Sequence, residues 1–344
     1  MDLLFFYWDR ALSFCRLYNK ISFQNIRYFL SIDKMSVIYH SDYESPVPRP
    51  LKNGGNTCYM NAVLQFFLSC TEAIQSLHIF ARRFPNSEVL NHWMQFVRQY
   101  DNPESSTSFI SIDPILSILS MKGCTQFLQN HQGDAHEFLM ALLDIFHEEL
   151  DAIQSRNSQN RDGRGRIVHG GDDDDNVTNN NNNIDDNVIT LSSWLSHYFM
   201  FQVERKPATQ PQSELMIVVP VRQTLEEALE VWFDGGNTLL LTFPIYLMIL
   251  ISRYDETSVH QSMHIPLSIQ VKERSIQYYW KSSINHHGLT YFGGHYDSLV
   301  RHAPDQKIYL CDDHNIQIVS SETFASLLST SYILVYEMQS PPAR

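Results

Sequence analysis

The spacing of apolar residues predicts two helices in the first half of the chain. Downstream of Asn53, apolar side chains recur at intervals of three and four, which places them on one helix face; they are Val63, Phe66, Phe67 and Cys70. Residues 132–150, "QGDAHEFLMALLDIFHEEL", carry a longer apolar stripe. Its members are Ala135, Phe138, Leu139, Leu142, Leu143, Phe146 and Leu150. Asp144, His147 and Glu148 fall on the other side, so this helix has one buried face.

After residue 191 the pattern changes to short runs of β-branched and aromatic residues separated by turn or polar signals, which predicts strands. These runs are residues 213–221, 239–254, 264–271, 275–288, 293–302, 307–313 and 331–337, with one helical piece at 224–233. The most apolar run, from Thr238, is shorter than the roughly 20 residues of a membrane-spanning helix. Pro244 also interrupts it, so we expect a buried strand. Helices followed by strands indicate an α+β fold class.

Three segments define the expected domain organisation. Residues 1–47 form an N-terminal extension of uncertain structure, and the prolines of "SPVPRP" favour an extended connector at its end. Residues 48–340 form one folded domain. After Asp151 the chain has almost nothing apolar to bury, which predicts a disordered, Asp/Asn-rich insert at about 153–188.

Charge and cysteine usage narrow the class of protein. The formal net charge of −13 argues against a nucleic-acid binder, although much of the acidic excess lies in the predicted insert. The five cysteines are scattered and form no C-x-x-C pair, which indicates a reducing compartment and no zinc ribbon. The N-terminus lacks the pattern of a signal peptide. We therefore expect a cytoplasmic and/or nuclear monomer that binds no membrane, metal or cofactor.

The stretch "NGGNTCYMNAVLQFF" places a thiol where a flexible turn enters a helix. The positive end of the helix dipole would favour the thiolate of Cys58, which is the nucleophilic form. Gly54 and Gly55 allow a tight turn, and Asn53 adds a side-chain N–H donor, as an oxyanion hole requires. The alternative is that Cys58 is a small buried hydrophobic residue.

Partners for such a nucleophile occur near the other end of the chain. His295 follows Gly293 and Gly294 and precedes a strand, and the glycines would leave a groove for an extended peptide. Asp312 and Asp313 stand at a later strand end, where either could orient an imidazole, although an Asp pair is also an ordinary turn signal. The order Cys, His, Asp favours a catalytic triad. The neighbouring histidines, at 286, 287 and 302, are expected at the surface.

These motifs resemble a known family, the ubiquitin-specific proteases, which are papain-like deubiquitinating enzymes. "NGGNTCYMNAVLQ" is similar to their cysteine box, "QGDAHEFLMALLD" to their Gln-Asp box, and "INHHG", "GGHYDSLVR" and "YLCDD" to their histidine box. The likeness spans roughly residues 51–337. It implies a papain-like cysteine protease fold with a helical thumb and a β-sheet palm.

The resemblance also implies roles for individual residues. Cys58 would be the nucleophile, His295 the general base and acid, and Asp312 the residue that orients His295, while Asn53 and the Cys58 N–H would hold the oxyanion. The residues implied to contact the tail of ubiquitin are Gln132, Asp134, Glu137, Gly293, Gly294 and Tyr296. For Asp134 and Glu137 the alternative is a charge that complements the helix dipole.

The chain departs from the family pattern in ways that affect the expected activity. Residues 203–219, which correspond to the fingers, carry no cysteine, so a reduced fingers subdomain without zinc ligands is expected. Gly133, Ile308 and Cys311 replace larger residues of the family. The implied function is hydrolysis of the bond after the last glycine of ubiquitin. The alternatives are a catalytically weak ubiquitin-binding scaffold and a protease for another ubiquitin-like modifier.

Overall fold

The computed structural model describes most of the predicted folded domain. The described ranges are 46–102, 109–128, 132–162, 194–207, 210–253, 261–271, 276–290 and 293–339. The predicted extension before Pro46, and the insert from residue 163 to 188, lie outside the described residues. All described residues belong to one compact unit.

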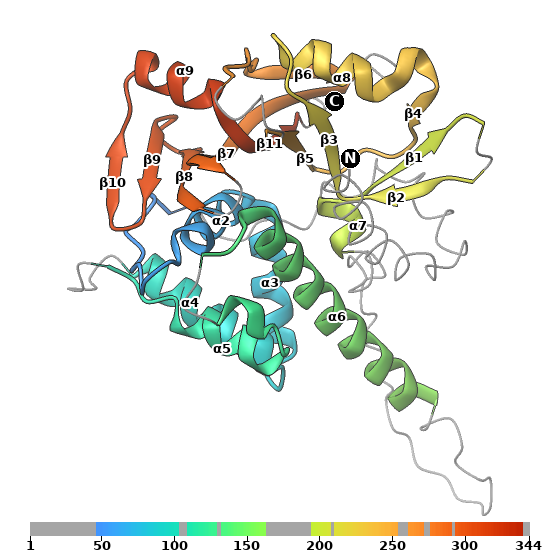
Figure 1. Cartoon of the computed structure of the whole chain (residues 1–344). Coiled ribbons are helices and arrows are strands. Elements are labelled where there is room, and N and C mark those ends of the chain that lie inside the picture. The colour runs from blue at the N-terminus through green and yellow to red at the C-terminus, as the bar shows by residue number, and fades with distance from the viewer. Residues whose placement is uncertain are drawn as a thin grey trace, which may run out of the picture. The chain divides into compact units, whose positions relative to one another are not determined.

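The first half of the described chain is helical (Figure 1). Its elements are α2 (Cys58–Leu68), α3 (Thr71–Arg83), α4 (Glu88–Asp101), α5 (Asp113–Met121), η3 (Thr125–Phe127), α6 (Ala135–Asp162) and α7 (Trp194–Tyr198). Every residue of α2 is buried, so this helix is the core of the helical half rather than a surface helix. Stacked and edge-to-face aromatic rings close the core around it, with Phe67 and Trp93 5.6 Å apart between ring centroids.

Both predicted helices are present, but α6 is longer than predicted. It continues to Asp162, whereas the sequence indicated loss of structure from about residue 153. Ile153 is only 6% exposed and extends the apolar stripe by one more contact. The polar residues that follow include Gln154 and Arg156, which are good helix formers and prolong a helix that is already nucleated.

The second half is built on two sheets (Figure 1). The larger is eight-stranded, with the order β10-β9-β8-β7-β11-β5-β3 and with β6 paired to β7. Its strands are β3 (Met216–Pro220), β5 (Tyr246–Ser252), β6 (Ser268–Val271), β7 (Ile276–Thr290), β8 (Gly293–Arg301), β9 (Ile308–Asp312), β10 (Asn315–Ile318) and β11 (Ser331–Met338). The smaller contains β1 (Phe201–Arg205), β2 (Gln212–Glu214) and β4 (Thr238–Leu240).

Two further helices flank these strands. They are α8 (Leu225–Phe233), which the sequence predicted, and α9 (Ser321–Ser329), which it did not. The side chain of Ser320 caps α9 by accepting a hydrogen bond from the Thr323 N–H. Phe324 then packs on Trp280 of β7, with ring centroids 4.9 Å apart, so tertiary packing holds this short helix.

The apolar run from Thr238 forms two strands in different sheets instead of one. β4 pairs with β1, and β5 lies between β3 and β11 in the large sheet. Pro244 stands between β4 and β5 in a segment without regular structure, as expected for a residue that lacks a backbone donor. Among the described residues, no helix is both long enough and apolar enough to cross a membrane.

The contact between α2 and the large sheet positions the start of α2. Helix α2 packs mainly against β8, with further contacts to β7 and β9. At its far end the hydroxyls of Ser69 and Ser282 lie 2.8 Å apart. At its near end the Leu51 N–H donates to the carbonyl oxygen of Asp313, at 2.8 Å, immediately after β9. The N-terminus of α2 is therefore fixed beside the ends of β8 and β9.

A buried histidine on α3 predicts acid sensitivity. His78 is 8% exposed, and burial lowers its pKa to about 4 from the ordinary value of 6.5. Below pH 6.5 the imidazole is protonated in the unfolded chain but stays neutral in the folded chain. The free energy of unfolding therefore decreases as pH falls from 6.5 to 4. The cost is at most about 1.4 kcal/mol per pH unit.

The His78→Gln variant isolates this contribution, because glutamine does not titrate. We expect its free energy of unfolding, measured with urea, to improve relative to that of the parent protein as pH is lowered from 7 to 5. Parallel pH dependences of the two proteins would contradict the assignment.

Candidate active site

Cys58 is the first residue of α2 and is 4% exposed. The turn before it needs left-handed backbone, with φ of +101° at Gly55 and +57° at Asn56. Asn53 stabilises the turn, because its Oδ1 accepts hydrogen bonds from the Gly55 N–H at 2.9 Å and from the Thr57 hydroxyl at 3.1 Å. The first N–H groups of a helix have no partner within the helix, so the thiol lies at a cluster of backbone donors.

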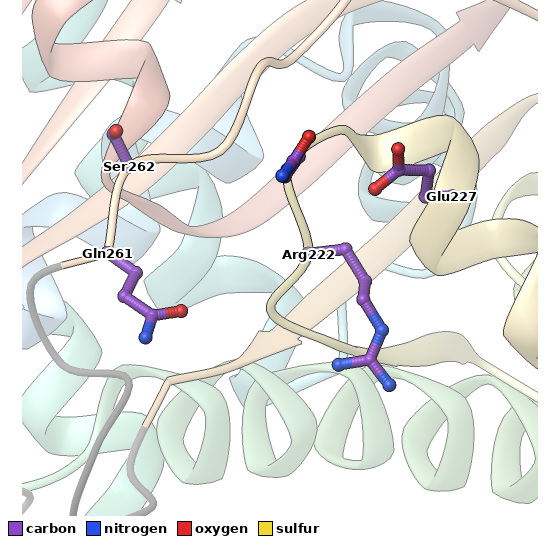
Figure 2. Close-up of a pocket in the computed structure, with 5 residues that line it drawn as sticks. Arg222, Glu227, Gln261 and Ser262 are labelled. Atoms are coloured by element: carbon purple, nitrogen blue, oxygen red, sulfur yellow. The ribbon is translucent and has the colours of Figure 1, made fainter.

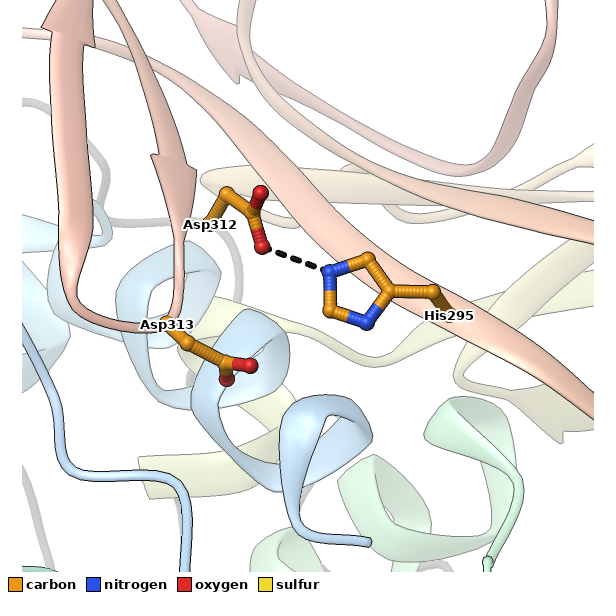
Figure 3. A group of neighbouring side chains, drawn as sticks. All are labelled: His295, Asp312 and Asp313. Carbon is orange, nitrogen blue, oxygen red and sulfur yellow. Dashed lines mark hydrogen bonds and ion pairs between the residues drawn. The ribbon is translucent and has the colours of Figure 1, made fainter.

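His295 lies between Cys58 and Asp312. Its Nε2 is 2.5 Å from Oδ1 of Asp312, the last residue of β9 (Figure 3). The other ring nitrogen is left for Cys58, whose thiol is a hydrogen-bond partner of His295. The structure therefore brings together the three residues of the predicted triad, although they lie on α2, β8 and β9.

The electrostatics of His295 favour its charged form. Hydrogen bonding to Cys58, followed by the hydrogen bond and the charge of Asp312, raises its pKa to about 10, against an opposing effect of burial. The imidazolium is thus stable at neutral pH, where it would stabilise a neighbouring thiolate.

Asp313 has a different place from Asp312, although both were candidates to orient the histidine. Its side chain lies beside α2 (Figure 3), where it is bound by residues of the cysteine turn and of the helix. Its two carboxylate oxygens accept hydrogen bonds at 2.7 Å from the Nδ2 of Asn53 and the Nδ2 of Asn61. Asp313 is 9% exposed and has a φ of +50°. It ties the cysteine turn and α2 to the end of β9.

One N–H of the Asn53 amide is thus occupied by Asp313, which leaves the second for another acceptor. Because Oδ1 of Asn53 is held by the turn, the orientation of the amide is fixed from both sides. The predicted oxyanion role of Asn53 remains a prediction.

Gln132 lies against the strand that carries His295. Its Oε1 accepts a hydrogen bond from the Gly294 N–H at 3.1 Å, and its Nε2 donates to the Gly294 carbonyl oxygen. The side-chain amide therefore pairs with the backbone of Gly294 as a neighbouring strand would. Both residues are at the surface, where an extended peptide could compete for the same backbone groups.

Gly294 is required for a reason that the sequence did not reveal. A Cβ placed there would lie 2.4 Å from Nε2 of His286. His286 is partly buried and packs on Tyr296, with ring centroids 4.4 Å apart. A Cβ at Gly293 would meet only Gln132, at 4.0 Å. The predicted groove beside these glycines remains a prediction.

Asp134 and Tyr296 form a contact inside the protein. Asp134 is 5% exposed, and its Oδ2 accepts hydrogen bonds from the hydroxyls of Tyr296 at 3.0 Å and Tyr332 at 3.2 Å. Its Oδ1 accepts from the Glu137 N–H at 3.0 Å, which caps the start of α6. These contacts fit the helix-terminus interpretation of Asp134. Contacts of Asp134, Glu137 or Tyr296 with a substrate stay predictions.

Gly133 explains one departure from the family pattern. A Cβ at this position would lie 2.7 Å from the ring of Tyr59, the residue after the cysteine. Tyr59 cannot yield easily, because it is 1% exposed and packs edge-on against Phe138 at 5.9 Å. The glycine therefore makes room for the tyrosine.

The remaining histidines were expected at the surface, and the structure shows that this expectation is wrong for His302. His302 is 5% exposed and its Nδ1 lies 2.8 Å from Oδ1 of Asp305, so it is not a surface residue. His286 is partly buried, and burial lowers its pKa to about 4. His287 is exposed, but it is bound to Asp297.

Two other groupings were compared with the triad. His295, Asp312 and Asp313 offer ligand atoms within 4.8 Å of one another, but the hydrogen bonds above already use these atoms. A pocket on the sheet half is lined by Arg222, Gln223, Glu227, Gln261 and Ser262 (Figure 2). The Ser262 hydroxyl is a possible nucleophile, but no described hydrogen bond pairs it with a base, so the triad is the better candidate for catalysis.

Comparison with known proteins decides the family. A model described as ubiquitin carboxyl-terminal hydrolase matches residues 49–336. The chain belongs to this family. Ubiquitin carboxyl-terminal hydrolase 24 of Arabidopsis thaliana is 22% identical over 84% of this chain and 64% of its own length. Ubiquitin carboxyl-terminal hydrolase 2 of Bos taurus is 22% identical over 86% of this chain and 55% of its own. The chain thus spans less than two thirds of these hydrolases.

Solved structures support the fold of the ubiquitin carboxyl-terminal hydrolase family. The structure of the SAGA Ubp8/Sgf11/Sus1/Sgf73 DUB module bound to ubiquitin aldehyde contains a chain that matches with a TM-score of 0.61 and 16% identity. The match covers 85% of this chain and 70% of that one. The predicted α+β class and papain-like protease fold are confirmed.

The candidate site also contains residues that sequence reasoning missed. Asn61 and Tyr332 bind the two carboxylates, Asp313 and Asp134, that connect the helices to the sheet. Asn61 lies three residues after the cysteine in the quoted motif, and its burial in an apolar helix was a usable signal. Tyr332 lies 19 positions after Asp313, the end of the histidine box, and carries no distinguishing pattern.

The pairing of His295 with Asp312 predicts the result of an Asp312→Asn substitution. Loss of the carboxylate removes one hydrogen bond and one charge that raise the pKa of His295, so we expect its pKa to fall below about 10. An NMR titration of the imidazole, assigned by its loss in His295→Gln, measures the shift. Asp305→Asn, which breaks the separate contact with His302, should leave the titration of His295 unchanged. An equal shift in both variants would contradict the pairing.

Proposed function

We propose that this chain is a thiol-dependent deubiquitinase that hydrolyses the isopeptide or peptide bond after the C-terminal glycine of ubiquitin. The observation that carries the proposal is the position of His295, which bridges the thiol at the start of α2 and the carboxylate at the end of β9. Membership of the ubiquitin carboxyl-terminal hydrolase family supports ubiquitin as the modifier. Two structural neighbours are DUB modules bound to ubiquitin aldehyde or to monoubiquitin.

The first chemical step is acyl transfer to the enzyme. The Cys58 thiolate attacks the carbonyl carbon of the terminal glycine, and the negative charge moves to the carbonyl oxygen. The Cys58 N–H and the free N–H of Asn53 stabilise that oxyanion. The His295 imidazolium gives its proton to the departing amine, and collapse of the tetrahedral intermediate breaks the C–N bond and leaves a thioester.

The second step restores the enzyme. Neutral His295 takes a proton from water, the hydroxide attacks the thioester carbonyl, and the sulfur leaves as thiolate. The products are the ubiquitin carboxylate, a proton released to solvent by the new carboxylic acid, and the original thiolate–imidazolium pair. Asp312 orients the ring and stabilises its charged form in both steps.

The substrate side of the proposal rests on the surface beside His295. Gln132 and Gly294 present backbone-like donors and acceptors at the edge of the site, and an extended glycine-rich tail has the width to pair with them. Gln132, Glu137, Gly293 and Gly294 are proposed to contact this tail. The site needs no metal or cofactor for the steps above, and we propose that the chain acts as a monomer in the cytoplasm or nucleus.

A fluorogenic ubiquitin substrate tests the proposed activity. We expect release of the fluorophore from the C-terminus of ubiquitin by the parent chain, and no release by Cys58→Ala, because no other nucleophile among the described residues is paired with His295. Cys70→Ala is a matched control, since Cys70 is buried at the other end of α2 and should leave turnover intact. Release by Cys58→Ala would exclude the mechanism, and reaction only with another ubiquitin-like substrate would change the modifier.

A pair of asparagine variants tests the oxyanion role. Asn53 and Asn61 each donate one hydrogen bond to Asp313, but only Asn53 lies in the turn before the thiol. We expect Asn53→Ala to lower kcat by about 10²–10³-fold, the effect of losing one oxyanion donor. Asn61→Ala should mainly lower thermal stability. Equal losses of kcat in the two folded variants would assign both residues to support of Asp313.

A further inference from the structure

A second His–Asp pair lies next to the triad. His287 on β7 is directly opposite His295 on β8 in the antiparallel register. Its Nε2 is 2.6 Å from Oδ2 of Asp297, two residues after His295. Because directly opposed residues of two strands point to the same face, this second pair shares the sheet face of His295.

The carboxylate of this second pair is buried and fixed. The side chain of Asp297 is 7% exposed, and its other oxygen accepts a hydrogen bond from Nδ2 of Asn285 at 2.8 Å. The Ser331 hydroxyl in turn donates to Oδ1 of Asn285 at 2.9 Å. A chain of hydrogen bonds across β11, β7 and β8 therefore holds Asp297 in place, and the His287 imidazole is its one charged hydrogen-bond donor among the contacts that the structure describes.

The charges of the two pairs interact. The register of β8 and β9, in which Ser298 is opposite Cys311, places Asp297 next to Asp312. The charge of His287 interacts electrostatically with Asp297 and His295 on β8, with Asp312 on β9, and with its neighbour His286 on β7. His286 is neutral above pH 5 because burial lowers its pKa to about 4. Two carboxylates thus lie side by side, each with its own imidazole.

We propose that His287 is a positioning residue. Its positive charge neutralises Asp297, so the His295 ring keeps its hydrogen bond to Asp312 and does not turn to Asp297. Without a charged His287, the buried carboxylate of Asp297 adds a second negative charge near His295. That charge makes the His295 imidazolium a weaker acid toward the leaving amine, and it offers the ring a competing acceptor. The effect on turnover rests on the proposed function, whereas the effect on Cys58 reactivity does not.

This role of His287 predicts an extra step in the pH dependence of kcat. The hydrogen bond to Asp297 raises the pKa of His287 above its ordinary value of 6.5. Its compensating charge therefore persists to higher pH than that of an ordinary histidine and is lost as pH rises through this raised value. We expect kcat to fall there to a second, non-zero plateau, roughly three- to tenfold lower, since one pKa unit corresponds to a tenfold change in proton affinity.

Three variants separate charge compensation from a structural role. His287→Gln keeps a donor for Asp297 but has no charge, so its kcat should lie at the lower plateau at every pH, without the step. His287→Gln combined with Asp297→Asn makes the pair neutral, and its kcat should return to the upper plateau, again without the step. His302→Gln removes a different paired histidine and should keep the step.

The rate of Cys58 alkylation by iodoacetamide, measured over the same pH range, provides a readout that needs no ubiquitin. We expect a step in this rate for the parent chain at the same pH as in kcat, and none in His287→Gln. A step that persists in His287→Gln, no step in the parent chain, or a double variant that stays at the lower plateau would overturn the proposal. A chain with the alkylation step but no cleavage of ubiquitin would contradict the proposed function alone.

Discussion

The geometry of the site depends on one buried carboxylate, Asp313. It accepts amide hydrogen bonds from Asn53 before the thiol and from Asn61 one turn into α2, while its carbonyl oxygen receives the Leu51 N–H. Charge-assisted hydrogen bonds of this kind contribute about 1.5–3 kcal/mol each. Because Asp312 and Asp313 are adjacent and bind different partners, the contact that anchors α2 also determines where Asp312 meets His295.

A second constraint is close packing beside the site, which requires glycine at one position in the sheet and at one in the helical half. Gly294 allows the His286 ring to pack beneath the strand that carries His295, and Gly133 allows the Tyr59 ring to pack beneath the start of α6. In both places an aromatic or imidazole ring occupies the volume that a side chain would need. The glycines of the motifs therefore serve packing inside the protein as well as any groove for a peptide.

The sequence predicted the parts of this site that have a local signature. The amphipathic stripe of residues 135–150, the turn into α2 and the β-branched runs each arise from interactions between neighbours in the chain, and they reveal the α+β class. The split of residues 239–254 between two sheets and the helix α9 depend on distant partners, such as Trp280 under Phe324. Asp312 binds His295 and Asp313 binds α2. This division likewise depends on the φ of Asp313 and on the position of Asn61, neither of which can be read from residue spacing.

Paired histidines on one sheet show why residue type alone does not assign a role. His286 and His287 are adjacent, yet one is pressed between Tyr296 and Gly294 and kept neutral by burial, while the other is exposed and held by a carboxylate. Alternation along β7 directs them to opposite faces of the sheet. The pKa of His286 consequently falls and that of His287 rises, so of these two neighbours it is His287 that keeps a charge to higher pH beside the His295 imidazole.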